Sequence, residues 1–219
     1  LTLFFFIALV PSTGLKAQTI FFEDFETSGS LPGALPAGWG TSLTNVVGNN
    51  FENSFQIWNS QTVNSVGYFP APERGNNNRF AAIRNANAQC ACDNDLAYFE
   101  TPSIDFSGAT NPALRFSIFN PDFENVDRAW VSGSIDDGLS WQIIGYVFET
   151  DTITNLPDHP DDWKYVALNV EDYAGISNVK IRFFWRNQGT TTLLYPIDYL
   201  GSGYAIDDVT IDEFDNFNI

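Results

Sequence analysis

The sequence is poor in the residues that build metal and redox centres. Its 219 residues include no methionine, one histidine and two cysteines. A zinc site needs about four ligands, more than Cys90, Cys92 and His159 readily supply. In an oxidising compartment the two cysteines are expected to bond to each other and close a very small ring, or else to pair with another molecule. The small ring would add little global stability, because closing so short a loop saves little chain entropy.

Positive charge is also scarce. The chain carries 10 Lys and Arg against 27 Asp and Glu, a formal net charge of −17 at pH 7. Nucleic acids and anionic membrane surfaces should repel so acidic a chain. The charges are interspersed with aromatic and β-branched residues, which argues against disorder. The composition therefore indicates a folded extracellular protein that can bind divalent cations.

Long apolar runs are missing except at the start of the chain. Leu1–Val10 is apolar, residues 11–14 interrupt the run, and Ala17 is a small residue at which a signal peptidase could cut. The run is too short for a comfortable membrane span. We therefore expect residues 1–18 to be a signal peptide that lacks its first residues, and export to follow. The alternative is a buried N-terminal strand.

Sustained helical periodicity is absent as well, apart from one short turn that residues 170–176 could hold. Five segments instead alternate apolar and polar residues or are rich in β-branched and aromatic residues. These expected strands are residues 114–119, 129–135, 141–148, 164–170 and 179–185. Gly, Pro, Asn and Asp clusters separate them at intervals typical of a β-sandwich. We predict an all-β, antiparallel, two-sheet domain over residues 19–212, followed at 213–219 by a linker or the start of a further region.

One short motif has a recognisable spacing. Ser134-Ile-Asp-Asp-Gly-Leu-Ser-Trp141 reads Ser-x-Asp-x-Gly-x-Ser-Trp and resembles the Asp-box, a hairpin turn repeated in sialidases. In such a turn the Asp136 carboxylate accepts backbone N–H groups, Gly138 supplies a positive φ angle, and Trp141 packs beneath. Sialidases repeat the box on several blades, whereas this chain has one. We therefore interpret it as a hairpin lock and not as a catalytic acid.

Several further segments occur in an order that resembles a known family. They are Leu35-Pro-Ala-Gly-Trp39, Phe99-Glu-Thr-Pro-Ser-Ile-Asp-Phe-Ser107, the Asp-box, Trp163-Lys-Tyr-Val-Ala-Leu-Asn-Val170, Tyr173-Ala-Gly175 and Ala205-Ile-Asp-Asp-Val209. Together they resemble the MAM-like jelly-roll domains of secreted Bacteroidetes-like bacterial proteins, the choice-of-anchor and cleaved-adhesin type. The resemblance implies a jelly-roll β-sandwich whose first and last strands lie together, often with structural calcium. It also implies a non-catalytic module of a longer, multidomain protein, used in adhesion or appended to enzymes.

Acidic residues occur on the apolar strands at both ends of the domain. Mapped onto the family pattern, the candidate calcium ligands are Glu23, Glu26, Asp207 and Asp208. If Val209 points to the core, strict alternation puts Asp207 on the same buried face. A buried carboxylate is unfavourable without a partner, so Asp207 should have a cation, an Arg or several N–H donors. Calcium suits such a set because it accepts carboxylate and carbonyl oxygens in irregular geometry.

Catalytic signatures are missing. The sequence contains no His-Glu-x-x-His, no Gly-x-Ser-x-Gly and no glycine-rich phosphate loop. His159 lies in an acidic, Pro-punctuated segment that would orient a general base poorly. We therefore expect no enzyme, and keep a carbohydrate-active hydrolase or lyase on a similar sandwich as the alternative.

Aromatic residues are plentiful and divide into two groups. We expect five tryptophans to belong to the core because they fall within strands or motifs, namely Trp39, Trp58, Trp141, Trp163 and Trp185. Trp130, Tyr195 and Tyr199 are the candidate ligand-binding residues, since each could present a flat apolar face at a loop or strand end. The expected function is a secreted or cell-surface module that binds an extracellular glycan or protein. A purely structural spacer is the third possibility.

Overall fold

A computed structural model describes residues 18–27, 30–44, 55–65, 78–84, 93–119, 128–148, 163–188 and 203–213. Within these residues the chain forms eleven strands, one short α-helix and one 3-10 turn. The strands are β1 (Thr19–Glu23), β2 (Gly40–Thr44), β3 (Gln56–Asn59), β4 (Arg79–Arg84), β5 (Asp93–Glu100), β6 (Pro112–Phe119), β7 (Arg128–Ser134), β8 (Gln142–Phe148), β9 (Lys164–Asn169), β10 (Lys180–Gln188) and β11 (Gly203–Glu213). The helical elements are α1 (Ser60–Ser65) and η1 (Glu171–Tyr173).

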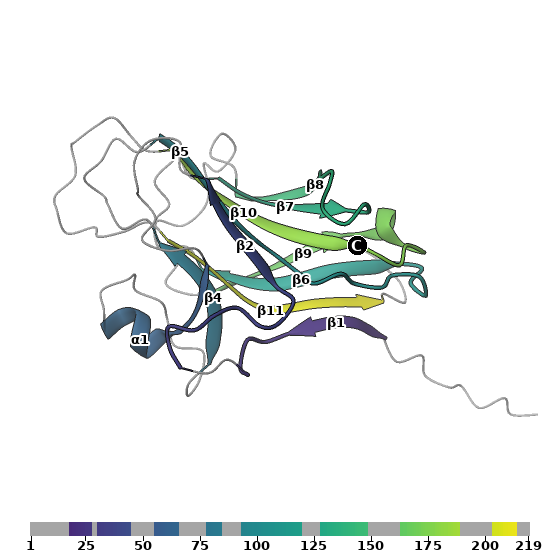
Figure 1. The fold of residues 1–219 in the computed structure, drawn as a ribbon. Helices are drawn as coiled ribbons and strands as arrows, with labels where there is room; N and C mark the ends of the chain where they lie inside the picture. Colours follow the sequence, from purple (N-terminus) through teal and green to yellow (C-terminus); the bar gives the residue numbers. More distant parts are fainter. Residues whose placement is uncertain are drawn as a thin grey trace, which may run out of the picture.

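The strands form two antiparallel sheets that face each other (Figure 1). The six-stranded sheet has the order β3-β4-β11-β6-β9, with β1 paired to β11 beside this path. The five-stranded sheet has the order β2-β5-β10-β7-β8. The prediction of an all-β, antiparallel, two-sheet sandwich is thus confirmed, and each of the five expected strands is present to within a few residues.

The core lies between the two sheets and is rich in aromatic side chains. From β10, Ile181, Phe183 and Trp185 point inward and are fully buried. Phe183 stacks on Phe99 of the neighbouring strand β5, with ring centroids 5.0 Å apart and planes 16° from parallel. Burial of each such side chain stabilises the fold by about 1.5–3 kcal/mol. Because strand residues alternate between faces, the residues between these three point to the outer surface.

A second, smaller apolar cluster covers part of the outer face of the six-stranded sheet. Its buried members are Trp58, Phe80, Ala82, Phe119 and Ala205, and Trp163 packs against them. The predicted burial of Trp58 and Trp185 is therefore confirmed, although Trp58 belongs to this outer cluster, and Trp163 is only partly buried beside it. Trp39 packs partly buried against the main core.

The short helix α1 was not expected, because the sequence shows no sustained helical periodicity there. It follows directly from β3, and the Asn59 side-chain oxygen accepts the Thr62 N–H at 2.8 Å. An Asn side chain that binds an N–H in the first turn stabilises a helix start. The short turn predicted for residues 170–176 is confirmed as η1.

Candidate functional site

A row of aromatic residues crosses the outer face of the five-stranded sheet. Strand register places Tyr98 of β5 opposite Phe184 of β10, Phe184 opposite Trp130 of β7, and Trp130 opposite Tyr146 of β8. Residues directly opposite on antiparallel strands share a face, so all four belong to one surface. We call these four residues the aromatic row. It was not predicted as a unit, because only Trp130 stood out in the sequence.

The rings at the centre of the row pack face to face. Trp130 and Phe184 are parallel to within 9° with centroids 4.8 Å apart. Tyr98 lies on the other side of Phe184 at 5.4 Å and 55°. Phe184 is only 8% exposed, whereas Tyr146 at the β8 end is 48% exposed. The row therefore has a packed centre and an open end at the edge strand β8.

Arg182 forms the next outward position of β10 and joins the row to the Asp-box. Its guanidinium carbon lies 3.7 Å from the ring centroids of both Tyr98 and Trp141. Its Nη2 and Nε atoms donate to Oε2 of Glu100 at 2.6 and 3.1 Å. A guanidinium stacks well on aromatic faces while it binds a carboxylate in its plane. Trp141 is thus part of this surface, not of the core as expected.

The Asp-box folds as the sequence predicts and holds Trp141 in place. Asp136 accepts hydrogen bonds from the Ser134 and Ser140 hydroxyls at 2.8 and 2.5 Å and from the Ser140 N–H at 2.9 Å. These bonds, above all those from Ser140, lower the pKa of Asp136 to about 2. Gly138 has a φ of 90°, and its carbonyl accepts the Trp141 Nε1–H at 2.9 Å. The described geometry supports the hairpin-lock interpretation.

A lysine ties the same hairpin to the sheet. Lys180 Nζ lies 2.8 Å from Asp137 and 3.7 Å from Glu100. The hydrogen bond to Asp137 is the main reason why the pKa of Lys180 is raised.

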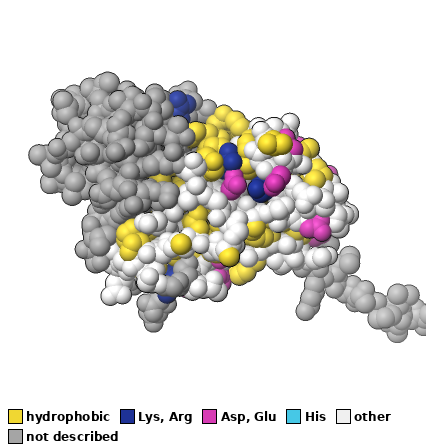
Figure 2. Space-filling model, in the orientation of Figure 1, with side chains coloured by type: hydrophobic (Ala, Val, Ile, Leu, Met, Phe, Trp, Pro, Cys, Tyr) yellow, Lys and Arg dark blue, Asp and Glu magenta, His cyan; other side chains and the backbone are white. Residues whose placement is uncertain are grey.

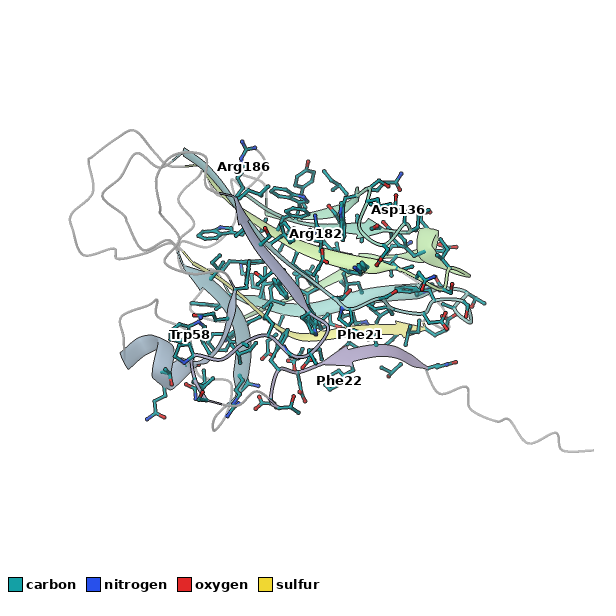
Figure 3. All side chains as sticks on the ribbon, in the orientation of Figure 1. Phe21, Phe22, Trp58, Asp136, Arg182 and Arg186 are labelled. Carbon is teal, nitrogen blue, oxygen red and sulfur yellow. The ribbon has the colours of Figure 1, made fainter. Side chains whose placement is uncertain are left out.

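Acidic and basic side chains lie next to one another on this part of the surface (Figure 2). Figure 3 shows Arg182 and Arg186 on the five-stranded sheet, away from Trp58 and Phe21 on the other sheet.

The two acidic end strands do lie together, as predicted. β1 pairs antiparallel with β11, and Glu23 is opposite Val209. Because Val209 is a core residue, Glu23 lies on the inward side of the strand pair. Its Oε1 accepts the Phe25 N–H at 2.7 Å. Partial burial raises the pKa of Glu23 in spite of this hydrogen bond.

The expectation that Asp207 shares a face with Val209 is wrong, although its burial is confirmed. Asp207 pairs with Ser117 and Thr210 with Arg115, so two residues of β11 oppose the single residue between them on β6. Such a β-bulge resets the alternation of the strand. Asp208 is the bulged residue, with a φ of 53°. Asp207 therefore points to the outer face of the six-stranded sheet, where it is nevertheless 0% exposed.

Glu26 reaches the same region from the other end of the domain. Its Oε1 accepts the Asn78 side-chain N–H at 3.0 Å and the Arg79 N–H at 2.8 Å. Ile206 of β11 pairs with Ala81 of β4, so the next residue, Asp207, also comes beside the start of β4. Glu26, by its hydrogen bonds, and Asp207, by the register, thus both come to the start of β4, while Glu23 is directed inward.

The donor set at this place is smaller than the sequence suggested. Within the described ranges, no three His, Cys, Asp or Glu side chains come close enough to hold one metal ion. Further oxygens would have to complete a calcium site, which calcium tolerates because it binds carbonyl oxygens as readily as carboxylates. Asn78 offers one: its Oδ1 is buried and has no hydrogen-bond partner. The chemistry of Glu26, Asn78 and Asp207 fits calcium on this observation.

Several predicted features lie outside the described residues. They are the ligand-binding candidates Tyr195 and Tyr199, the disulfide candidates Cys90 and Cys92, His159, and residues 1–17 of the expected signal peptide. None of the described helices is long and apolar enough to cross a membrane.

The signal that could have revealed the aromatic row is cross-strand register. Tyr98, Phe184 and Tyr146 alternate with core residues on their own strands, and alternation alone marks them as surface positions. Only the pairing of β5, β10, β7 and β8 shows that these positions are neighbours. Arg182 and Glu100 were missed for the same reason, because 82 residues separate them along the chain.

Solved structures share this fold. The K1 cleaved adhesin domain of Lys-gingipain from Porphyromonas gingivalis W83 is 15% identical, and the match covers 90% of this chain and 99% of that domain with a TM-score of 0.53. The K3 domain of the same protein is 17% identical over 91% of this chain and 100% of that domain, again with a TM-score of 0.53. No protein-family model matches the sequence, and no curated protein matches it. The chain therefore has the two-sheet sandwich fold of the cleaved adhesin domains.

Proposed function

We propose that this chain is a secreted or cell-surface, non-catalytic binding module of the MAM-like, choice-of-anchor type within a longer protein. Its ligand is an extracellular glycan or protein, held on the outer face of the five-stranded sheet. The aromatic row is the observation that carries this proposal, because the register brings four large rings together on one outer face, and aromatic rings offer a ligand an apolar surface with a polar edge. The fold shared with cleaved adhesin domains and the acidic composition support it.

The outer face of the five-stranded sheet also favours a binding module over the two alternatives, a spacer domain and a carbohydrate-active enzyme. A spacer domain would need no row of four aromatic residues in register across one sheet face. A hydrolase would need a carboxylate that can act as an acid or base. The carboxylate beside the row, Glu100, is instead held by Arg182 in a charge-assisted hydrogen bond of 2.6 Å. The binding function agrees better with this arrangement than either rival does.

The purified protein should be tested on a combined array of glycans and extracellular-matrix proteins. We expect at least one reproducible ligand, whose signal falls in a Trp130→Ala variant. The matched control is Tyr165→Ala, because Tyr165 is 64% exposed on the other sheet. If no glycan and no matrix protein on the array binds, or if the binding signal falls equally in Trp130→Ala and Tyr165→Ala, the proposal of a binding module that uses this face is contradicted.

We further propose that calcium stabilises the joined ends of the fold. Glu26, Asp207 and Asn78 are the residues that would hold it, as the fit of the buried Asn78 Oδ1 supports. Calcium would there bind the buried Asp207 carboxylate, whose Oδ1 also accepts the Asp208 N–H at 2.8 Å. Glu23 and Asp208 from the original set are less well placed, since one points inward and the other is the bulged residue. The ion would have a structural role away from the aromatic row.

A further inference from the structure

We propose that the ligand is a neutral glycan and that one sugar ring packs against Trp130 at the junction of β7 and β8. This inference rests on the proposed function and adds the ligand class and the contact point. It follows from three properties of the outer face: the orientation of the rings, the hydrogen-bonding groups beside them and the balance of charge.

The orientation of the rings turns one flat face of the Trp130 indole away from Phe184. Trp130 and Phe184 are parallel and 4.8 Å apart, the usual distance between neighbouring strands. The rings therefore stand upright on the sheet, and Phe184 covers one face of the indole. The other indole face is turned toward β8, where Tyr146 is the register partner of Trp130. A pyranose ring, with its apolar C–H face, is a flat object of the right chemistry for this position.

Hydrogen-bonding groups occupy the neighbouring row of the same face. Register places Glu100 opposite Arg182, and Arg182 opposite Ser132. The carboxylate accepts and the guanidinium donates hydrogen bonds, so this pair can bind hydroxyls of a further sugar of the same glycan, beyond the ring that packs on Trp130. The side chains of Arg182 and Glu100 are still 14% and 18% exposed, so their outer edges remain accessible to such hydroxyls.

The balance of charge on this face favours a neutral ligand. The outward cations Arg182 and Lys180 already bind Glu100 and Asp137. An acidic glycan would have to compete with these carboxylates, and the net charge of −17 would repel it. Arg186 is the next outward residue of β10 beyond Phe184 and is paired in register with Arg128 of β7. An acidic glycan bound across the row would come close to this position, so Arg186→Ala distinguishes an acidic from a neutral ligand.

Affinity electrophoresis and calorimetry on the purified protein would test this inference. The neutral probes are β-glucan, xylan and galactomannan, and the acidic probes are polygalacturonate and heparin. We expect a neutral probe to bind, and Trp130→Ala and Tyr146→Ala each to weaken it by roughly ten-fold or more, as central aromatic contacts do. Tyr165→Ala and Arg186→Ala should leave the affinity unchanged. Tyr146→Ala protects the test if Trp130→Ala fails to fold, because Tyr146 lies at an edge strand.

The possible binding results distinguish failure of the neutral-glycan inference from failure of the proposed function. Binding of acidic probes alone, with loss in Arg186→Ala, would overturn the neutral-glycan inference. So would binding of a neutral probe that survives both Trp130→Ala and Tyr146→Ala. A matrix protein that binds in a Trp130-dependent manner while no glycan binds would leave the proposed function standing and refute the inference. Absence of any ligand on glycans and proteins would refute both.

Discussion

At the scale of single residues, charged side chains are held either by bonds within their own turn or by contacts with neighbouring strands. Asp136 bonds within its own turn, Glu23 bonds to Phe25 two residues on, and Arg182 lies between two rings. Of these three contacts, only those of Asp136 could be predicted from the sequence. The Asp-box is a local motif with fixed spacing, so its sequence determines its geometry. The environment of Arg182 depends on residues of β5 and of the hairpin before β8, which no local pattern reports.

The Asp136 carboxyl should titrate well below its ordinary range. Its pKa falls from 3.8 to about 2 because the folded turn bonds the ionised form. The stability that the carboxylate contributes is therefore present above about pH 4 and is lost as the pH falls through about 2. The difference in free energy of unfolding between the wild type and Asp136→Asn should shrink over that window. Carbon-13 NMR of the carboxyl measures the pKa directly, and a value near 3.8 would contradict the described turn.

Calcium should raise the melting temperature through Asp207. A ligand that binds only the folded state stabilises it by about 2.7 kcal/mol at a hundred times its Kd, which is roughly 5–10 °C for a domain of this size. We expect a chelator to lower the melting temperature by that order and added calcium to restore it. Asp207→Asn should abolish the response.

The matched control for calcium is Asp105→Asn, because Asp105 is an exposed carboxylate that bonds only within its own turn to Ser107. This variant should respond to calcium as the wild type does. An identical melting curve of the wild type with chelator and with calcium would refute the calcium site, and would leave the binding function untouched.

At the scale of elements, alternation predicted the strands but not the bulge. The sequence indicated all of strands β6 to β10, although only some of them alternate: β9 alternates regularly, whereas β6 is buried on both faces. In β11 the inserted residue Asp208 shifts the pattern, so that Ile206, Val209 and Ile211 all face the core. Alternation assumes two residues per repeat and contains no sign of an insertion. This is why Asp207 was expected on the wrong face although its burial was anticipated correctly.

The bulge makes Asp208 sensitive to the shape of its substituent. At a φ of 53° a β-branched side chain is strained, whereas Gly adopts this conformation without a steric penalty. We expect Asp208→Val to lower the free energy of unfolding by about 1–2 kcal/mol and Asp208→Gly to change it by less than about 1 kcal/mol. Ala167→Val, at an exposed position of the regularly alternating strand β9, serves as the control and should have little effect. Urea unfolding measures all three, and equal stability of the Val and Gly variants at 208 would argue against the bulge.

At the scale of the whole molecule, the two sheets have different tasks. The six-stranded sheet joins the chain ends through β1 and β11 and carries a second apolar cluster on its outer face. The five-stranded sheet presents the aromatic row. The sequence could reveal the sandwich and the meeting of its ends, because strand patterns and end motifs suffice for these. It could not reveal the row, since a binding face assembled from four strands exists only after the strands have paired.

The net charge of −17 gives a last prediction that concerns the molecule as a whole. Salt screens the attraction between an acidic protein and a cationic ligand, with a Debye length of about 10 Å at 0.1 M and about 3 Å at 1 M. A neutral glycan feels no such attraction, so its Kd should change by less than about two-fold between 0.05 and 0.5 M NaCl. A basic protein ligand would instead lose affinity steeply over that range. Calorimetry at several salt concentrations distinguishes the two, and a steep decline for the bound ligand would show that overall charge, not the aromatic row, governs recognition.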